Sequence, residues 1–315
     1  MKKLKQGIVN KNIDENPSII YEHGDSATIL KEKYPDKYFD LIITSPPYNV
    51  GKEYETRKSI ETYLKEQEEI IEQIVRVTSD NGSICWQVGN FVDKNKEIFP
   101  LDIFYYNIFK KYNFKLRNRI VWHFGHGLHT KNRFSGRYEV ILWFSKSNNY
   151  IFNLDDVRIK SKYPGKRHFK GPNKGKLSGN PNGKNPSDVW DITIRDWEKE
   201  IWEIPNVNSN HKEKTEHPCQ YPIELVERCI LALSNNNSRI LDPFAGVGST
   251  LLASYINNRT AIGIEREKKY IEIGLERLDK LKSGQLKYRK IDQPLYDHKL
   301  SKLSVMPDEF IKNRK

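Results

Sequence analysis

The side chains best suited to chemistry gather in one short loop: Ser45, Pro46, Pro47 and Tyr48. Each proline fixes its own φ angle and removes a backbone donor, so the pair ends a strand and leaves a rigid loop. The loop offers a hydroxyl group, a backbone carbonyl and an aromatic face. These groups suit a planar heterocycle with an exocyclic amino group, which needs two acceptors for its N–H bonds and a ring to stack on. The alternative is a proline-rich turn that only caps a strand.

A second group of candidates lies far downstream. It comprises Asp242, Phe244, Gly246, Gly248 and Glu265. Glycines let the backbone approach a ligand closely, and the N-terminus of the following helix supplies free N–H groups for a carboxylate. An acid at the end of the next strand is placed to accept both hydroxyls of a ribose. A lone G-x-G does not identify one activity, because nucleotide-binding sheets of many activities contain it. The alternative role for Glu265 is a negative charge at the N-terminus of the following helix.

Both groups are expected at one edge of an α/β domain. The apolar runs 39–43, 238–241 and 260–264 predict buried parallel strands, and the periodicity of residues 266–282 predicts an amphipathic helix. In open α/β sheets, ligands bind outside the carboxyl ends of such strands. The two loops must therefore meet across neighbouring strand ends if they act together.

The two motifs resemble the signatures of DNA methyltransferases that modify exocyclic amino groups. That family carries (D/N/S)-P-P-(Y/F) after an apolar strand, and the form with Thr-Ser in front, as in residues 43–48, is typical of cytosine-N4 enzymes. The order of acceptor half, basic insert and donor half is similar to that of the permuted beta group. The resemblance implies an α/β, Rossmann-like, S-adenosylmethionine-dependent methyltransferase sheet with circularly permuted motifs and an inserted basic DNA-recognition region.

The resemblance implies roles at the base pocket. Ser45 and the Pro46 carbonyl would hold the target amino group, while Tyr48 would stack on the base. The hairpin of apolar runs 118–122 and 138–144, whose second strand is preceded by Arg137, would line the same pocket. The implied mechanism is direct transfer to a base flipped out of the duplex, without an enzyme nucleophile.

The implied cofactor is S-adenosyl-L-methionine, with expected contacts at Asp25, Thr215, Pro218, Asp242, Phe244, Gly246, Gly248 and Glu265. In the family, an acid at the position of Asp25 receives the adenine amino group, and the alternative for Asp25 is an N-cap of the next helix. Residues 217–222, His-Pro-Cys-Gln-Tyr-Pro, resemble the element that borders the methionine end of the cofactor. Thr215 and Pro218 are the candidates there.

The chain is expected to have four parts: a catalytic half (18–155), a basic target-recognition insert (156–205), a cofactor-binding half of the same domain (206–282) and a charged surface tail (283–315). Residues 157–187 hold nine basic side chains and no acid among repeated Gly, Pro and Asn. Such a segment cannot bury a core and suits a polyphosphate, although a solvated linker is the alternative. The expected DNA contacts are Lys131, Arg133, Arg137, Lys166, Arg167, Lys170, Lys174 and Lys176.

Composition narrows the class of protein. The 315 residues are 37% hydrophobic and 30% charged, and the net charge of +12 favours a polyanionic partner, although a lysine-rich coding habit would also produce it. No apolar run approaches the ~20 residues of a membrane span, so a cytoplasmic location without membrane contact is expected. The cysteines form no close pair, and the loop histidines lack a thiol or carboxylate beside them, so no metal site is expected.

The sequence thus predicts a site-specific methyltransferase that modifies the N4 amino group of cytosine in double-stranded DNA. It would serve as the modification enzyme of a restriction-modification system, with a cognate endonuclease acting on the same site without direct contact. A monomer and a homodimer both remain open. The alternatives are an adenine-N6 DNA methyltransferase, an amino-methyltransferase of RNA or protein glutamine, and a nucleotide-dependent oxidoreductase that uses the Gly246 turn.

Overall fold

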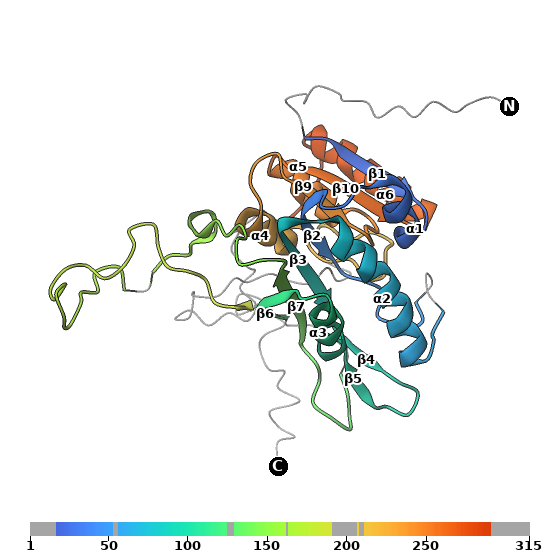
Figure 1. Ribbon diagram of the computed structural model, residues 1–315, viewed down its shortest axis with the longest axis horizontal. Coiled ribbons are helices and arrows are strands. Elements are labelled where there is room, and N and C mark those ends of the chain that lie inside the picture. The colour runs from blue at the N-terminus through green and yellow to red at the C-terminus, as the bar shows by residue number, and fades with distance from the viewer. Residues whose placement is uncertain are drawn as a thin grey trace, which may run out of the picture.

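An eight-stranded sheet forms the centre of the protein (Figure 1). The computed structural model describes residues 17–52, 56–124, 129–161, 163–190, 207 and 211–290. In spatial order the strands are β1 (Ile19–His23), β10 (Thr260–Glu265), β9 (Arg239–Asp242), β2 (Phe39–Thr44), β3 (Thr78–Val88), β7 (Tyr138–Ser145), β6 (Lys115–His123) and β8 (Val189–Trp190). The strands from β1 to β3 are mutually parallel, and β7 runs antiparallel to both of its neighbours.

Helices cover both faces of this sheet. One core cluster joins one face to α1 (Ser26–Lys33), α2 (Ile60–Val77) and α3 (Leu101–Lys111). A second cluster joins the other face to α4 (Ile223–Leu233), α5 (Ser249–Ile256) and α6 (Lys268–Lys282). A short 3-10 turn, η1 (Leu154–Val157), packs beside α4, and β4 (Asn90–Val92) pairs with β5 (Ile98–Pro100) outside the main sheet. The predicted Rossmann-like α/β architecture is confirmed.

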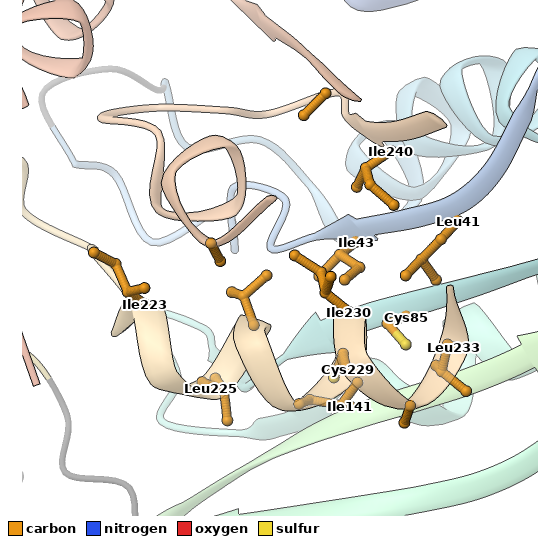
Figure 2. Close-up of a cluster of buried hydrophobic side chains, with 14 of the residues drawn as sticks. Leu41, Ile43, Cys85, Ile141, Ile223, Leu225, Cys229, Ile230, Leu233 and Ile240 are labelled. Carbon is orange, nitrogen blue, oxygen red and sulfur yellow. The ribbon is translucent and has the colours of Figure 1, made fainter. Parts of the chain in front are cut away.

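Strand β2 is anchored from both sides. Leu41 and Ile43 point toward α4, where they meet Ile230, while Ile42 belongs to the opposite cluster (Figure 2). All three β2 side chains are nearly or fully buried, and each contributes roughly 1.5–3 kcal/mol relative to an exposed position. Since the strand is held by both layers, the loop that leaves its carboxyl end starts from a fixed point.

The register of β2 and β9 brings the two predicted motifs to one edge. Leu41 pairs with Ile240 in parallel register, so both strands end side by side. The start of β7 reaches the same edge, because β7 is antiparallel to β3 and Val140 pairs with Val88 at the β3 end. Three segments far apart in the sequence therefore converge where an open sheet binds ligands.

Several predicted boundaries differ from the structure. Residues 98–112 are rich in Phe, Tyr and Ile, which predicts a buried helix, but α3 begins at Leu101, because residues 98–100 pair with β4 and Pro100 lacks an N–H for a helix interior. Asp80, Asn81 and Gly82 are typical turn residues, yet they lie inside β3, where its pairing with β2 is irregular. The helical spacing of residues 266–282 predicts an inward Leu275, but this side chain is 45% exposed.

The basic insert forms an arm that extends away from the sheet (Figure 1). Its described residues are almost all exposed, and two isolated bridges tie the arm together, Ile159 with Lys184 and Arg167 with Leu177. The chain rejoins the sheet at β8, inside the range 156–205 that was expected to form the insert. Residues 191–206 of that range lie outside the described residues.

The predicted surface tail begins as expected, with residues 283–285 exposed, but it turns inward at residue 286. Leu286 and Tyr288 pack against the core, and Arg289 is 8% exposed and donates to the buried carboxylate of Glu224. Arg289 also donates its backbone N–H to Glu213, so opposite charges draw this segment inward. Residues 291–315 lie outside the described residues. No helix within the described ranges is long and apolar enough to cross a membrane.

Candidate active site

A cavity of about 870 Å³ opens at the edge of the sheet where β2, β9 and β7 converge. Its volume falls in the upper part of the range for ligand pockets, roughly 300–1,000 Å³. The cavity is lined by ten of the sequence-predicted residues: Asp25, Ser45, Pro46, Pro47, Tyr48, Pro218, Phe244, Gly246, Gly248 and Glu265. The two motifs predicted from the sequence therefore share one site.

The Ser-Pro-Pro-Tyr loop is held from behind. The hydroxyl of Tyr63, on α2, donates to the carbonyl of Pro47 at 2.6 Å and also lies 2.6 Å from the hydroxyl of Tyr105. The carbonyl of Pro46 has no hydrogen-bond partner among the described residues. The loop thus presents an open acceptor beside the Ser45 hydroxyl, as the recognition of an amino group requires.

Glu139 is a site residue that was absent from the predicted set. It lies at the start of β7 and lines the cavity, and its Oε2 accepts hydrogen bonds from the Tyr48 hydroxyl at 3.3 Å and from the Gln87 amide. Burial raises the pKa of Glu139 to about 7, although both hydrogen bonds act in the opposite direction. The resemblance placed this hairpin strand, with its Arg-Tyr-Glu start, at the base pocket without naming Glu139 as a site residue.

The glycine loop turns through two left-handed glycines. Gly246 and Gly248 have φ angles of 47° and 80°, a region that glycine adopts more easily than other residues. A Cβ on Gly248 would lie 2.1 Å from the Tyr21 hydroxyl, and a Cβ on Gly246 would lie 3.1 Å from Nε2 of His217. The backbone of the loop can therefore approach a ligand directly, just ahead of the α5 N-terminus.

Glu265 ends β10, lines the cavity and accepts backbone N–H groups from the segments on either side of it. Its Oε2 accepts the Gly246 N–H and its Oε1 accepts the Glu267 N–H, each at 2.8 Å. The first bond fixes the glycine loop, and the second caps the start of α6. Burial raises the pKa of Glu265, while the backbone N–H groups of Glu267, Gly246 and Arg266 act in the opposite direction.

Asp25 is the N-cap of α1 and also lines the cavity. Its Oδ1 accepts the backbone N–H of Thr28 at 3.0 Å and the Thr28 hydroxyl at 2.9 Å. Its Oδ2 has no hydrogen-bond partner among the described residues. The capping role is observed, and it leaves an acceptor for an amino group.

Two expected cofactor contacts lie away from the cavity. Asp242 is fully buried and accepts hydrogen bonds from Thr44 at 2.6 Å, Thr250 at 2.6 Å, Tyr221 at 2.7 Å and the Phe244 N–H at 3.1 Å. These four donors occupy both carboxylate oxygens, and through them Asp242 ties the end of β2 to the loop after β9. A direct contact with a ligand is not available to it.

Thr215 likewise turns inward, because its hydroxyl donates to Gln220 at 2.8 Å and stabilises the turn before α4. Pro218 and His217, in contrast, line the cavity. The His217 ring packs edge-on against Tyr270 with centroids 4.4 Å apart, and burial lowers the pKa of His217 to about 4. A neutral imidazole beside Gly246 was missed, although its motif was noted.

The predicted DNA-contacting residues, all of them described in the structure, are not among the residues that line the cavity. Lys131 and Arg133 are exposed on the loop between β6 and β7, and Arg137 is half-buried. On the arm, the guanidinium of Arg167 donates to the Gly175 carbonyl and helps hold the bridge with residue 177. The remaining arm residues of this set, all exposed, are Lys166, Lys170, Lys174 and Lys176.

A family model described as DNA methylase, for N6 and N4 methyltransferases, matches residues 39–276 of this chain. The chain belongs to the N6/N4 DNA methylase family. The chain is 45% identical over 254 residues to the type II methyltransferase M.BglII of Bacillus subtilis; this alignment covers 81% of the present chain and 67% of M.BglII. It is 32% identical to the DNA adenine methyltransferase YhdJ of Escherichia coli, with 82% of this chain and 81% of that protein covered.

Solved structures agree on the fold of this DNA methylase. The cytosine-N4-specific PvuII DNA methyltransferase aligns with a TM-score of 0.61 over 84% of this chain and 89% of that one, at 18% sequence identity. Other solved structures with the same fold were determined with S-adenosyl-L-methionine bound.

Proposed function

We propose that this DNA methylase transfers a methyl group to the N4 amino group of cytosine at a specific site in double-stranded DNA. The observation that carries the proposal is the shared cavity, in which Ser45 and the open Pro46 carbonyl face the same space as Gly246. Serine ahead of Pro-Pro is typical of cytosine-N4 enzymes. The similarity to M.BglII supports a role as the modification enzyme of a restriction-modification system.

The base would enter the cavity after flipping out of the duplex, at a cost of a few kcal/mol. It would stack on Tyr48 while Ser45 Oγ and the Pro46 carbonyl accept its two amino N–H bonds. Those two bonds orient the nitrogen lone pair toward the donor. S-adenosyl-L-methionine supplies an activated methyl group on a sulfonium, so the protein needs to align two bound reactants and exclude water.

The donor would lie along the glycine loop. Glu265 would accept the ribose hydroxyls, the free Oδ2 of Asp25 would accept the adenine amino group, and Phe244 would contact the ring. The α5 N-terminus beside Gly248 is suited to the carboxylate of the methionine part. Pro218 and the neutral His217 would close this end of the cavity.

Duplex DNA would be held by the arm and by the loop between β6 and β7. Both carry exposed lysine and arginine side chains, which suit phosphate contacts. These contacts would fix the position of the duplex, so that the target nucleotide lies over Tyr48.

The second candidate is an adenine-N6 DNA methyltransferase, which the 32% identity to YhdJ favours. Adenine and cytosine present the same pair of amino N–H bonds, so both fit Ser45 and the Pro46 carbonyl. An RNA or protein-glutamine substrate is the more distant alternative. Membership of the DNA methylase family excludes the oxidoreductase that the Gly246 turn alone allowed.

Incubation with labelled S-adenosyl-L-methionine and unmethylated duplex DNA, followed by nucleoside analysis, tests the proposal. We expect 4-methylcytosine. Finding 6-methyladenine would replace cytosine by adenine as the substrate. No labelled nucleoside in DNA, together with label in RNA or protein in parallel incubations, would overturn the assignment.

A further inference from the structure

A chain of hydrogen bonds leads from the methyl-transfer site to the half-buried carboxylate of Glu139. The Oγ of Ser45 lies 3.0 Å from the Tyr48 hydroxyl, and the Tyr48 hydroxyl donates to Oε2 of Glu139 at 3.3 Å. These hydrogen bonds join the loop after β2 to the start of β7, since Tyr48 and Glu139 are 91 residues apart in the sequence. They begin at the serine that faces the substrate amino group in the proposed function.

The direction of these hydrogen bonds follows from Glu139. An ionised carboxylate only accepts, and tyrosine has one O–H, so Tyr48 directs that proton to Glu139. Ser45 must then donate to the Tyr48 oxygen. The lone pairs of Ser45 are thereby left to accept an N–H bond from the base.

Tyr48 keeps its own proton in this arrangement. Burial raises the pKa of Tyr48 well above its ordinary value, and the carboxylate of Glu139 raises it further. The hydroxyl therefore stays protonated and can pass one proton on while it receives another.

Glu139 is enclosed on its other sides by groups that carry no charge. Gln87 on β3 donates an amide N–H to Oε2, Trp122 is its partner in the β6 register, and Oε1 lies beside Gly89. Among the described residues, Tyr48 is the titratable side chain in contact with Glu139, and the nearby thiol of Cys219 acts on Tyr48 by raising its pKa. Since no cation among the described residues acts on Glu139, its carboxylate is suited to accepting a proton.

We propose that Glu139 is a positioning residue that takes up, through Tyr48 and Ser45, the proton released by the amino group during methyl transfer. The inference rests on the proposed function, because it requires an amino nitrogen at Ser45. A nitrogen–carbon bond forms as the sulfur–carbon bond breaks, and the sulfonium becomes a thioether. The methylated nitrogen gives its proton to Ser45 as Ser45 passes one to Tyr48 and Tyr48 passes one to Glu139. The transfer thus removes the positive charge of the sulfonium and the negative charge of Glu139.

Direct methyl transfer leaves a proton that must be removed from the product base, and the path to Glu139 provides an acceptor for it. The positive charge of the sulfonium would otherwise remain on the product base inside a cavity from which water is excluded. An acceptor whose pKa lies near the working pH is best able to take a proton and release it again. The value of about 7 for Glu139 meets that condition.

Single-turnover rates of methyl transfer to duplex DNA, measured from about pH 5.5 to about pH 8.5, test the inference. Ionised Glu139 is the active form, so the wild-type rate should fall about tenfold per pH unit below the pKa and level off above it. Glu139→Gln keeps an acceptor for Tyr48 but cannot take a proton. We expect its rate at high pH to be lower by about 10²-fold or more, and its pH profile to be flat.

Tyr48→Phe interrupts the same chain and keeps the stacking ring. We expect Tyr48→Phe, Glu139→Gln and the double variant to lose similar amounts, because the groups act as one unit. Glu276→Gln, on the exposed side of α6, is the matched control and should behave as wild type. Binding of S-adenosyl-L-methionine, measured by calorimetry, should be unchanged in all variants.

A wild-type rate and pH profile in Glu139→Gln would overturn the inference while DNA methylation by the wild type stood. Additive losses in the double variant would also overturn it, since separate structural effects add. If the wild type transferred no methyl group to DNA, the proposed function would fail, and the inference would fail with it.

Discussion

Removing the hydroxyl of Thr44 should weaken the link between the two motif loops. Thr44 is 1% exposed at the end of β2, and its hydroxyl donates at 2.6 Å to Asp242, 198 residues away. Thr44→Val keeps the shape of the side chain and removes this donor. Hydrogen bonds to charged groups contribute about 1.5–3 kcal/mol, and Asp242 keeps its three other donors, so we expect a loss of about 2 kcal/mol.

The measurement is urea unfolding of wild type, Thr44→Val and Thr44→Ser near pH 8. Thr44→Ser is the matched control, because it retains the hydroxyl and loses one buried methyl group, at a cost of about 1 kcal/mol. The valine variant should also show slower single-turnover methylation, since the two loops lose a shared anchor. The reasoning is refuted if the valine variant is as stable as wild type, or more stable than the serine variant.

Three further predictions concern the loops and the arm. Tyr48→Ala should abolish methyl transfer and leave the calorimetric affinity for S-adenosyl-L-methionine unchanged, because the ring faces the base; weakened donor binding would contradict this placement. Gly248→Ala should lower stability and donor affinity, since its Cβ would lie 2.1 Å from the Tyr21 hydroxyl, and adding Tyr21→Phe should restore part of the stability. Without any such recovery, the steric argument would be wrong. Replacing the exposed arm lysines Lys166, Lys170 and Lys174 by glutamine should reduce the slope of log affinity against log salt for duplex DNA by up to about 2.7. An unchanged slope would mean that DNA does not contact the arm.

Local signals were enough to predict the framework. The two prolines after Thr44 end β2 wherever the strand lies, and the spacing of Gly246 and Gly248 predicts a turn before a helix without reference to the rest of the chain. Their meeting in one cavity followed from a general rule about parallel strands. These features depend on neighbouring residues, so the sequence reveals them.

The features that the sequence did not reveal depend on pairing between distant segments. Glu139 reaches the cavity only because β7 inserts antiparallel between β3 and β6, which places its first residues at the ligand edge. Asp242 looked like a ligand contact, but the hydroxyls that occupy it come from β2, α5 and the turn before α4. Arg289 was assigned to the surface because its partner Glu224 lies 65 residues earlier.

The pairing of β1 with β10 has a consequence for how the enzyme is made. Ribosomes add about 5–20 residues per second, so on the order of ten seconds or more separates the emergence of β1 from that of β10. During that time β1 has no neighbour, and one side of β2 stays open, because β9 and β10 fill the gap between them. The growing polypeptide can thus form its Ser-Pro-Pro-Tyr loop early, yet it gains the means to hold a methyl donor only after β9 and β10 have also been synthesised.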